Sequence, residues 1–174
     1  FGITNPTEVV EVRNPWLNLN TLIVRGVDLE ADYRWRMSER QSLNFRVLAS
    51  YVRDLITVDS VGSINRAGQT GVQTGAQPGM PRWSVNSTIS FDSGPFNFNV
   101  QGRFISAGIM DVTLVGPTDP GYSTNLPNSI SDNHIEAMVY VDLGASYTFD
   151  IGGHSLQLYG AIRNLTNPTP PVNV

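Results

Sequence analysis

The chain lacks, or has little of, several features that distinguish one class of protein from another. It has no cysteine, which excludes a disulfide framework and a thiolate metal site. It has no run of about 18 apolar residues, so the sequence provides no membrane-spanning helix. Charged residues are only 15% of the chain, against about a quarter in a typical soluble domain. All basic residues are arginines without a basic cluster, and the net charge is −4, which argues against nucleic acid as a partner.

What the sequence has instead is alternation of apolar and polar residues over long stretches. In residues 138–150 the odd positions are apolar or aromatic, and the even positions from Tyr140 onward are mostly polar. Because a β-strand points successive side chains to opposite faces, this stretch has one apolar face and one polar face. A strand in the wall of an outer-membrane barrel needs this pattern over about 9–11 residues.

The same pattern recurs along the chain. We expect six long strands, at residues 17–35, 42–57, 82–92, 96–107, 138–150 and 156–164, and a shorter one at 7–13. Their connections alternate between short turns, at 37–41, 93–95 and 151–155, and long loops, at 59–81 and 108–137. Outer-membrane barrels have short periplasmic turns and long extracellular loops, so the turns are predicted to be periplasmic and the loops extracellular.

Aromatic residues give a second indication of a membrane wall. One group is predicted to face outward near the short turns: Tyr33, Trp35, Phe91, Phe96, Tyr147 and Phe149. A second group faces outward near the long loops: Tyr51, Trp83 and Phe104. Two such bands match the aromatic girdles at the two membrane interfaces.

We therefore predict an all-β fold, an antiparallel up-and-down transmembrane β-barrel segment. Six strands cannot close, because small membrane barrels start at about eight strands and an open edge leaves backbone groups unpaired in lipid. The segment is expected to be an incomplete wall that needs further strands. A soluble β-sandwich also alternates, but its strands are shorter and its loops lack this rhythm.

Two motifs resemble those of TonB-dependent outer-membrane receptors. Residues 25–30 (RGVDLE) resemble their "G-V-[DE]-[LF]-E" strand, and residues 162–167 (IRNLTN), followed by three prolines, resemble their "N-L-[FT]-[DN]-x-x-P" segment near the end of the barrel. The order and spacing of the motifs fit the C-terminal third of that family, so the resemblance covers most of the chain.

The resemblance implies a 22-stranded barrel filled by an N-terminal plug domain, which imports scarce nutrients using energy passed through TonB. This sequence contains no plug, no TonB box and no closing strand with a terminal aromatic residue. We expect residues 1–174 to be a C-terminal portion of such a barrel, truncated at both ends. Its partners would be outer-membrane lipid, the remaining strands and plug of the full-length chain, TonB indirectly, and a siderophore, cobalamin or glycan. The alternatives are a passive porin or structural barrel, and a secreted β-sandwich that binds a ligand.

Candidate site residues fall into two groups, and none indicates catalysis, a metal or a cofactor. The sequence has no nucleophile elbow or phosphate loop, and His134 and His154 are expected on opposite sides of the membrane. Polar residues predicted to face the lumen are Asp28, Glu30, Asp32, Arg34, Arg46, Arg103, Asp142 and Arg163. Loop residues predicted to bind a ligand are Arg66, Gln69, Gln73, Tyr122, Asn125 and Asn133, since binding residues concentrate on loops held by a rigid scaffold.

Overall fold

The structure is a computed structural model, and it describes residues 21–59, 62–71 and 79–169. Its strands are β1 (Thr21–Arg36), β2 (Gln41–Val58), β3 (Ser63–Asn65), β4 (Trp83–Ser93), β5 (Phe96–Ile105), β6 (Gly108–Ile109), β7 (His134–Ile135), β8 (Met138–Ile151) and β9 (His154–Ile162). Among the described residues, no helix is long and apolar enough to cross a membrane.

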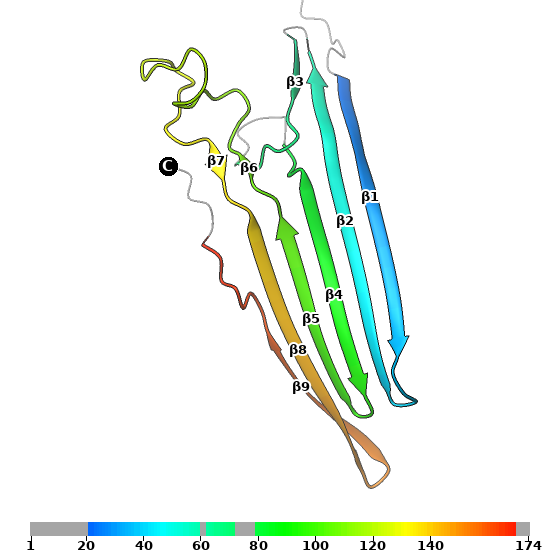
Figure 1. The fold of residues 1–174 in the computed structure, drawn as a ribbon. Helices are drawn as coiled ribbons and strands as arrows, with labels where there is room; N and C mark the ends of the chain where they lie inside the picture. Colours follow the sequence, from blue (N-terminus) through cyan, green and yellow to red (C-terminus); the bar gives the residue numbers. More distant parts are fainter. Residues whose placement is uncertain (1–20, 60–61, 72–78, 170–174) are drawn as a thin grey trace, which may run out of the picture.

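The long strands form one antiparallel meander, in the order β1-β2-β4-β5-β8-β9 (Figure 1). This confirms the predicted fold class and the six expected strands, whose described ends differ from the prediction by a few residues; the predicted start of the first strand, at residues 17–20, lies outside the described residues. The predicted strand at residues 7–13 lies outside the described residues. Both long loops contain short strands that the sequence did not indicate: β3 pairs with the end of β2, and β6 pairs with β7.

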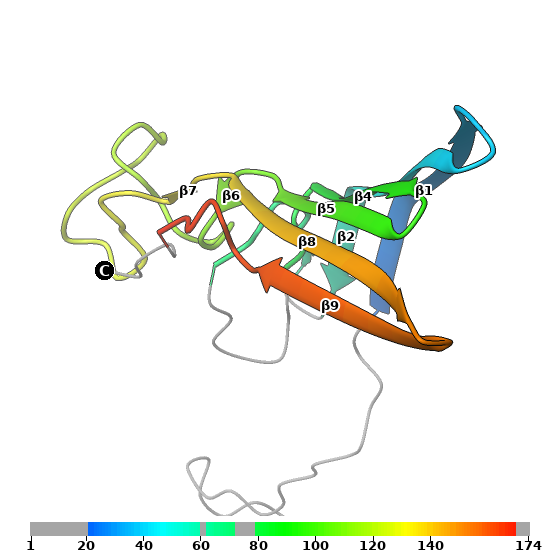
Figure 2. The same ribbon diagram turned by 90° about the horizontal axis from the view of Figure 1, so that it is seen from below.

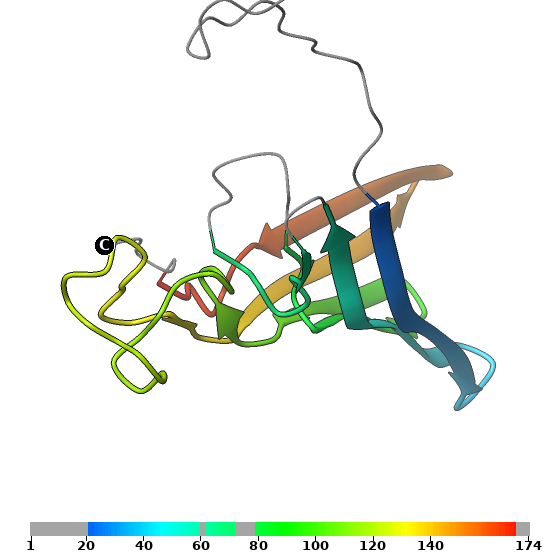
Figure 3. The ribbon, with the colours of Figure 1, turned by 90° about the horizontal axis from the view of Figure 1, so that it is seen from above.

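The sheet is a single curved layer, as Figures 2 and 3 show from its two ends. It does not close, because β1 and β9 are its two edges in the described part of the chain. The tight turns lie at one end and the long connections at the other (Figure 1). Gly94, Gly152 and Gly153 occupy the turns with positive φ, a conformation that glycine adopts without steric cost.

The strand register aligns the apolar side chains into continuous rows across one face. One such row runs through Trp35, Leu43, Phe91, Phe98 and Ala145. These rows remain open: Tyr33 is 65% exposed and Trp35 is 53% exposed. In the described residues the buried apolar side chains are only Leu55, Ala67 and Ile135, so no second sheet packs on this one as a β-sandwich would require.

Aromatic pairs lie on this apolar face at both ends of the strands. The rings of Tyr51 and Trp83 lie 4.7 Å apart near the long loops, and those of Tyr147 and Phe149 lie 4.6 Å apart near a tight turn. The apolar rows between them have the position that the hydrocarbon-facing band of an outer-membrane barrel occupies between its aromatic girdles.

A β-bulge interrupts the pairing of β1 with β2 just beyond the aromatic pair near the long loops, Tyr51 and Trp83 (the outer aromatic pair). Arg25 pairs with Asp54, whereas Gly26 pairs with Val52, so β2 has one extra residue at this point. A Cβ atom on Gly26 would collide with the carbonyl oxygen of Tyr51. Glycine is therefore required where the bulge brings the two backbones together.

Candidate functional site

The long connections join into one structured cluster at the outer end of the sheet. The first, after β2, turns back at Asn65, whose side-chain Oδ1 accepts hydrogen bonds from the backbone N–H groups of Leu55 (3.0 Å) and Ala67 (3.1 Å). Arg66 N–H in turn donates to the Leu55 carbonyl at 2.8 Å. The loop is thus fixed to the strand that it leaves.

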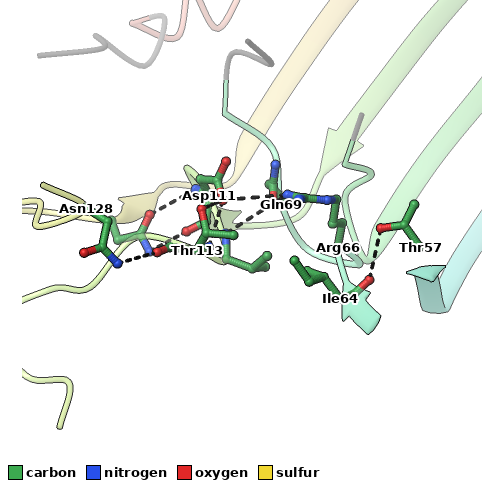
Figure 4. A network of polar contacts seen from close by, with 9 residues as sticks. Thr57, Ile64, Arg66, Gln69, Asp111, Thr113 and Asn128 are labelled. Atoms are coloured by element: carbon green, nitrogen blue, oxygen red, sulfur yellow. Dashed lines mark hydrogen bonds and ion pairs between the residues drawn. The ribbon is translucent and has the colours of Figure 1, made fainter. Parts of the chain in front are cut away.

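Gln69 connects this loop to the second one, 43 residues further along the chain (Figure 4). Its side chain is only 1% exposed. Its Oε1 atom accepts hydrogen bonds from the Arg66 guanidinium at 3.1 Å and from Val112 N–H at 3.2 Å. Arg66 also lies 3.7 Å from the Asp111 carboxylate, so its charge is paired across the two loops.

Asn133 holds the second loop together from its other end. Its amide accepts a hydrogen bond from Asp111 N–H at 3.1 Å and donates one to the Asp111 carbonyl at 2.9 Å. The Asp111 carboxylate also accepts bonds from the backbone and hydroxyl of Thr113. Arg66, Gln69 and Asn133, all three expected to bind a ligand, are therefore occupied in shaping the loops.

Two of the remaining loop candidates take no part in this network. Tyr122 is half-buried and Asn125 is exposed, both in the second loop. Gln73 lies outside the described residues. Between residues 109–120 and 131–134 the second loop forms an open cavity of about 620 Å³. This lies within the range of roughly 300–1,000 Å³ typical of ligand pockets.

The eight charged residues predicted to face the lumen fall on the polar face of the sheet, opposite the apolar rows. One row crosses five strands through Asp32, Arg46, Thr88, Gln101 and Asp142. Asp28, Glu30 and Arg34 alternate with the apolar residues of β1 in the same way. The Arg46 guanidinium donates to the Glu30 carboxylate at 2.7 Å, an exposed pair that contributes little to stability.

Arg103, Asp142 and Arg163 come together at the outer part of this polar face. They line a cavity of 230 Å³ between β5, β8 and the end of β9. The Arg103 guanidinium lies 4.4 Å from the centre of the Tyr140 ring, a cation–π contact. The Asp142 carboxylate accepts a 2.7 Å hydrogen bond from Asn164 N–H, which fixes the turn that follows β9.

Sequence reasoning missed two features of these surfaces. Tyr159, 84% exposed, shares the polar face with Ser146, and the alternation of β9 was sufficient to find it.

Asp54 accepts hydrogen bonds from Arg53 at 2.9 Å and Arg25 at 3.3 Å, and no sequence pattern marked this cluster because the bulge creates it. Asp54 lies three residues beyond Tyr51, outside the band between the aromatic pairs. The Arg53 guanidinium, with a smaller contribution from Arg25, lowers the pKa of the Asp54 carboxyl against the opposing effect of burial.

The histidines lie far apart, as expected: His134 begins β7 at the loop end and His154 begins β9 at the turn end (Figure 1). No group of three metal-binding side chains occurs in the described ranges.

A single curved antiparallel sheet, with one apolar face, one polar face and a rhythm of short and long connections, defines a segment of a transmembrane β-barrel wall. A family model described as "TonB dependent receptor-like, beta-barrel" matches residues 2–165. The chain belongs to this family, whose barrels are transporters, and the protein is a bacterial outer-membrane protein that acts in transport. The search of curated proteins found no match.

Proposed function

We propose that this chain forms part of the wall and two extracellular loops of a receptor that imports a scarce nutrient of the siderophore, cobalamin or glycan class. The observation that carries the proposal is the joint formed by Arg66, Gln69 and Asp111. It fixes two loops of distant sequence relative to each other at the outer end of the sheet. A fixed loop surface on a rigid scaffold is the arrangement in which binding residues are commonly held.

The proposed route inward follows the polar face. Its charged rows would line the lumen and contact either the plug domain or the passing nutrient. We further propose that residues 1–174 are a C-terminal portion of a larger barrel, whose other strands and plug belong to the same full-length protein. The nutrient would bind at the outer loops and plug, and would pass when TonB displaces the plug.

Uptake measurements in whole cells test this function. Cells that lack the complete receptor should lose energy-dependent uptake of one nutrient, and cells that lack TonB should lose the same uptake. Restoring the receptor should restore uptake only when TonB is present. If the purified receptor instead gives non-specific flux of small solutes in liposomes, and uptake is independent of TonB, a passive porin is the correct function.

A further inference from the structure

The cavity in the second loop has a wall of mixed chemistry. Asp119, Ser131, Asp132 and His134 provide polar groups, while prolines and branched aliphatic residues provide apolar surface. Sugars have the same mixture, since their hydroxyl groups form hydrogen bonds and their ring C–H faces contact apolar side chains. A cavity of 620 Å³ has room for a few sugar units.

The two carboxylates of the cavity are held in place by the loop's own backbone. Asp119 Oδ2 accepts a hydrogen bond from Gly116 N–H at 2.7 Å, and Asp132 Oδ1 accepts one from His134 N–H at 2.8 Å. Within the described ranges, no side-chain or backbone donor bonds to the other oxygen of either carboxylate. Each carboxylate is therefore oriented before a ligand arrives and keeps an oxygen that can accept a hydroxyl hydrogen bond, which is stronger for a charged acceptor.

The charge of this loop opposes anionic ligands. Residues 108–137 contain four carboxylates and neither arginine nor lysine. The guanidinium of Arg66, from the first loop, lies 3.7 Å from the Asp111 carboxylate. Its side chain is only 12% exposed, and its charge is already paired with Asp111. A phosphate, polycarboxylate or ferric catecholate would meet carboxylates in the cavity, whose described lining residues include no arginine or lysine to neutralise it.

From this geometry we infer that the cavity binds a neutral, hydroxyl-rich ligand of the oligosaccharide type and rejects anionic ligands. The inference rests on the proposed function and narrows it to one substrate class. The bound sugar donates hydroxyl hydrogen bonds to Asp119 and Asp132, and its ring faces lie against the apolar wall formed around Pro117 and Pro120.

Binding to the purified complete receptor, measured by calorimetry, tests the inference. The neutral probes are galactotriose, maltotriose, cellotriose and xylotriose; the anionic probes are trigalacturonate and a ferric tris-catecholate. Trigalacturonate is the matched partner of galactotriose, with a carboxylate in place of each hydroxymethyl group. We expect at least one neutral trisaccharide to bind, and at least tenfold more tightly than either anionic probe.

The double variant Asp119→Asn/Asp132→Asn should weaken binding of that trisaccharide by about 10- to 100-fold, the effect of losing charge-assisted hydrogen bonds. The control Asp150→Asn, the same change at the turn end of β8, should bind like the wild type. Retained heat-modifiable electrophoretic mobility shows that each variant is folded.

Equal or tighter binding of an anionic probe, failure of every neutral probe, or an unaffected double variant would overturn the inference. These results are distinct from failure of the proposed function. A receptor that binds the ferric tris-catecholate and imports it with TonB retains its proposed function and loses only the assigned substrate class.

Discussion

The assignment of the apolar face to lipid makes a direct prediction for two neighbouring residues of β2. Val47 lies on the apolar face, paired with Ala31 and Ser87. Leu48 is the next residue, lies on the polar face between Glu30 and Asn86, and is 40% exposed. Arginine substituted at these two positions therefore enters two different environments.

The position of Val47 determines the size of the effect. It lies four residues before Tyr51, in the outer aromatic pair, and four residues after Leu43, which shares a row with Trp35. At about 3.4 Å per residue it is roughly 14 Å along the strand from each aromatic level, near the middle of the apolar band. An arginine at the bilayer midplane destabilises a membrane barrel by about 2–4 kcal/mol. Val47→Arg should lower the free energy of unfolding by that amount.

Leu48→Arg is the matched control. Its guanidinium would point to the polar face, opposite the Glu30 carboxylate, so we expect the free energy of unfolding to change by no more than about 0.5 kcal/mol. Both variants of the complete receptor can be compared by reversible denaturant unfolding in lipid vesicles, followed by tryptophan fluorescence. If Leu48→Arg is destabilised as much as Val47→Arg, or more, the assignment of the two faces is wrong.

Three further predictions concern the loops and the bulge. Gln69→Leu leaves Val112 N–H without its partner and removes one hydrogen bond of Arg66, at a cost of about 1–3 kcal/mol to the local fold, so trypsin should cleave after Arg66 in the first loop at least several-fold faster while the barrel stays folded. Gly26→Ala forces a Cβ atom against the Tyr51 carbonyl and should lower the free energy of unfolding by about 1–3 kcal/mol, whereas Gly160→Ala, with open space around it, should be nearly neutral; similar effects of the two would contradict the bulge geometry. The neighbouring arginines lower the pKa of Asp54 in the folded protein. Its ionised carboxylate therefore stabilises the fold above the unfolded pKa of about 3.9, and this stabilisation is lost as pH falls through the lower folded pKa. Asp54→Asn should therefore lose less stability than the wild type between about pH 6 and pH 3.

The faces of the long strands could be predicted from the sequence because strand alternation is a local property. Each side chain points opposite to the one before it, so the odd residues of β8 had to share a face whatever their neighbours were. The register then brought those faces together across all six strands, and the eight charged candidates fell on the polar side. Glycine or proline marked two of the three tight turns, at 93–95 and 151–155, whereas the turn at 37–41 was marked only by its polar residues.

The cluster of outer loops could not be predicted in this way. The bond from Val112 N–H to Gln69 joins residues 43 positions apart, and neither segment has a periodic pattern. For the same reason Gln69 was predicted to bind a ligand, although it is almost fully buried and connects the two loops. The bulge at Arg53 was also invisible, since one extra residue changes the pairing without changing the local composition.

The sequence by itself determined which residues face lipid and which face the polar side, because that choice follows from the two-residue period of an extended chain. Only the tertiary structure decided which loop residues are buried and which remain accessible to a ligand. That decision depends on hydrogen bonds between distant segments, which form only after the strands have brought the two loops to the same end of the sheet.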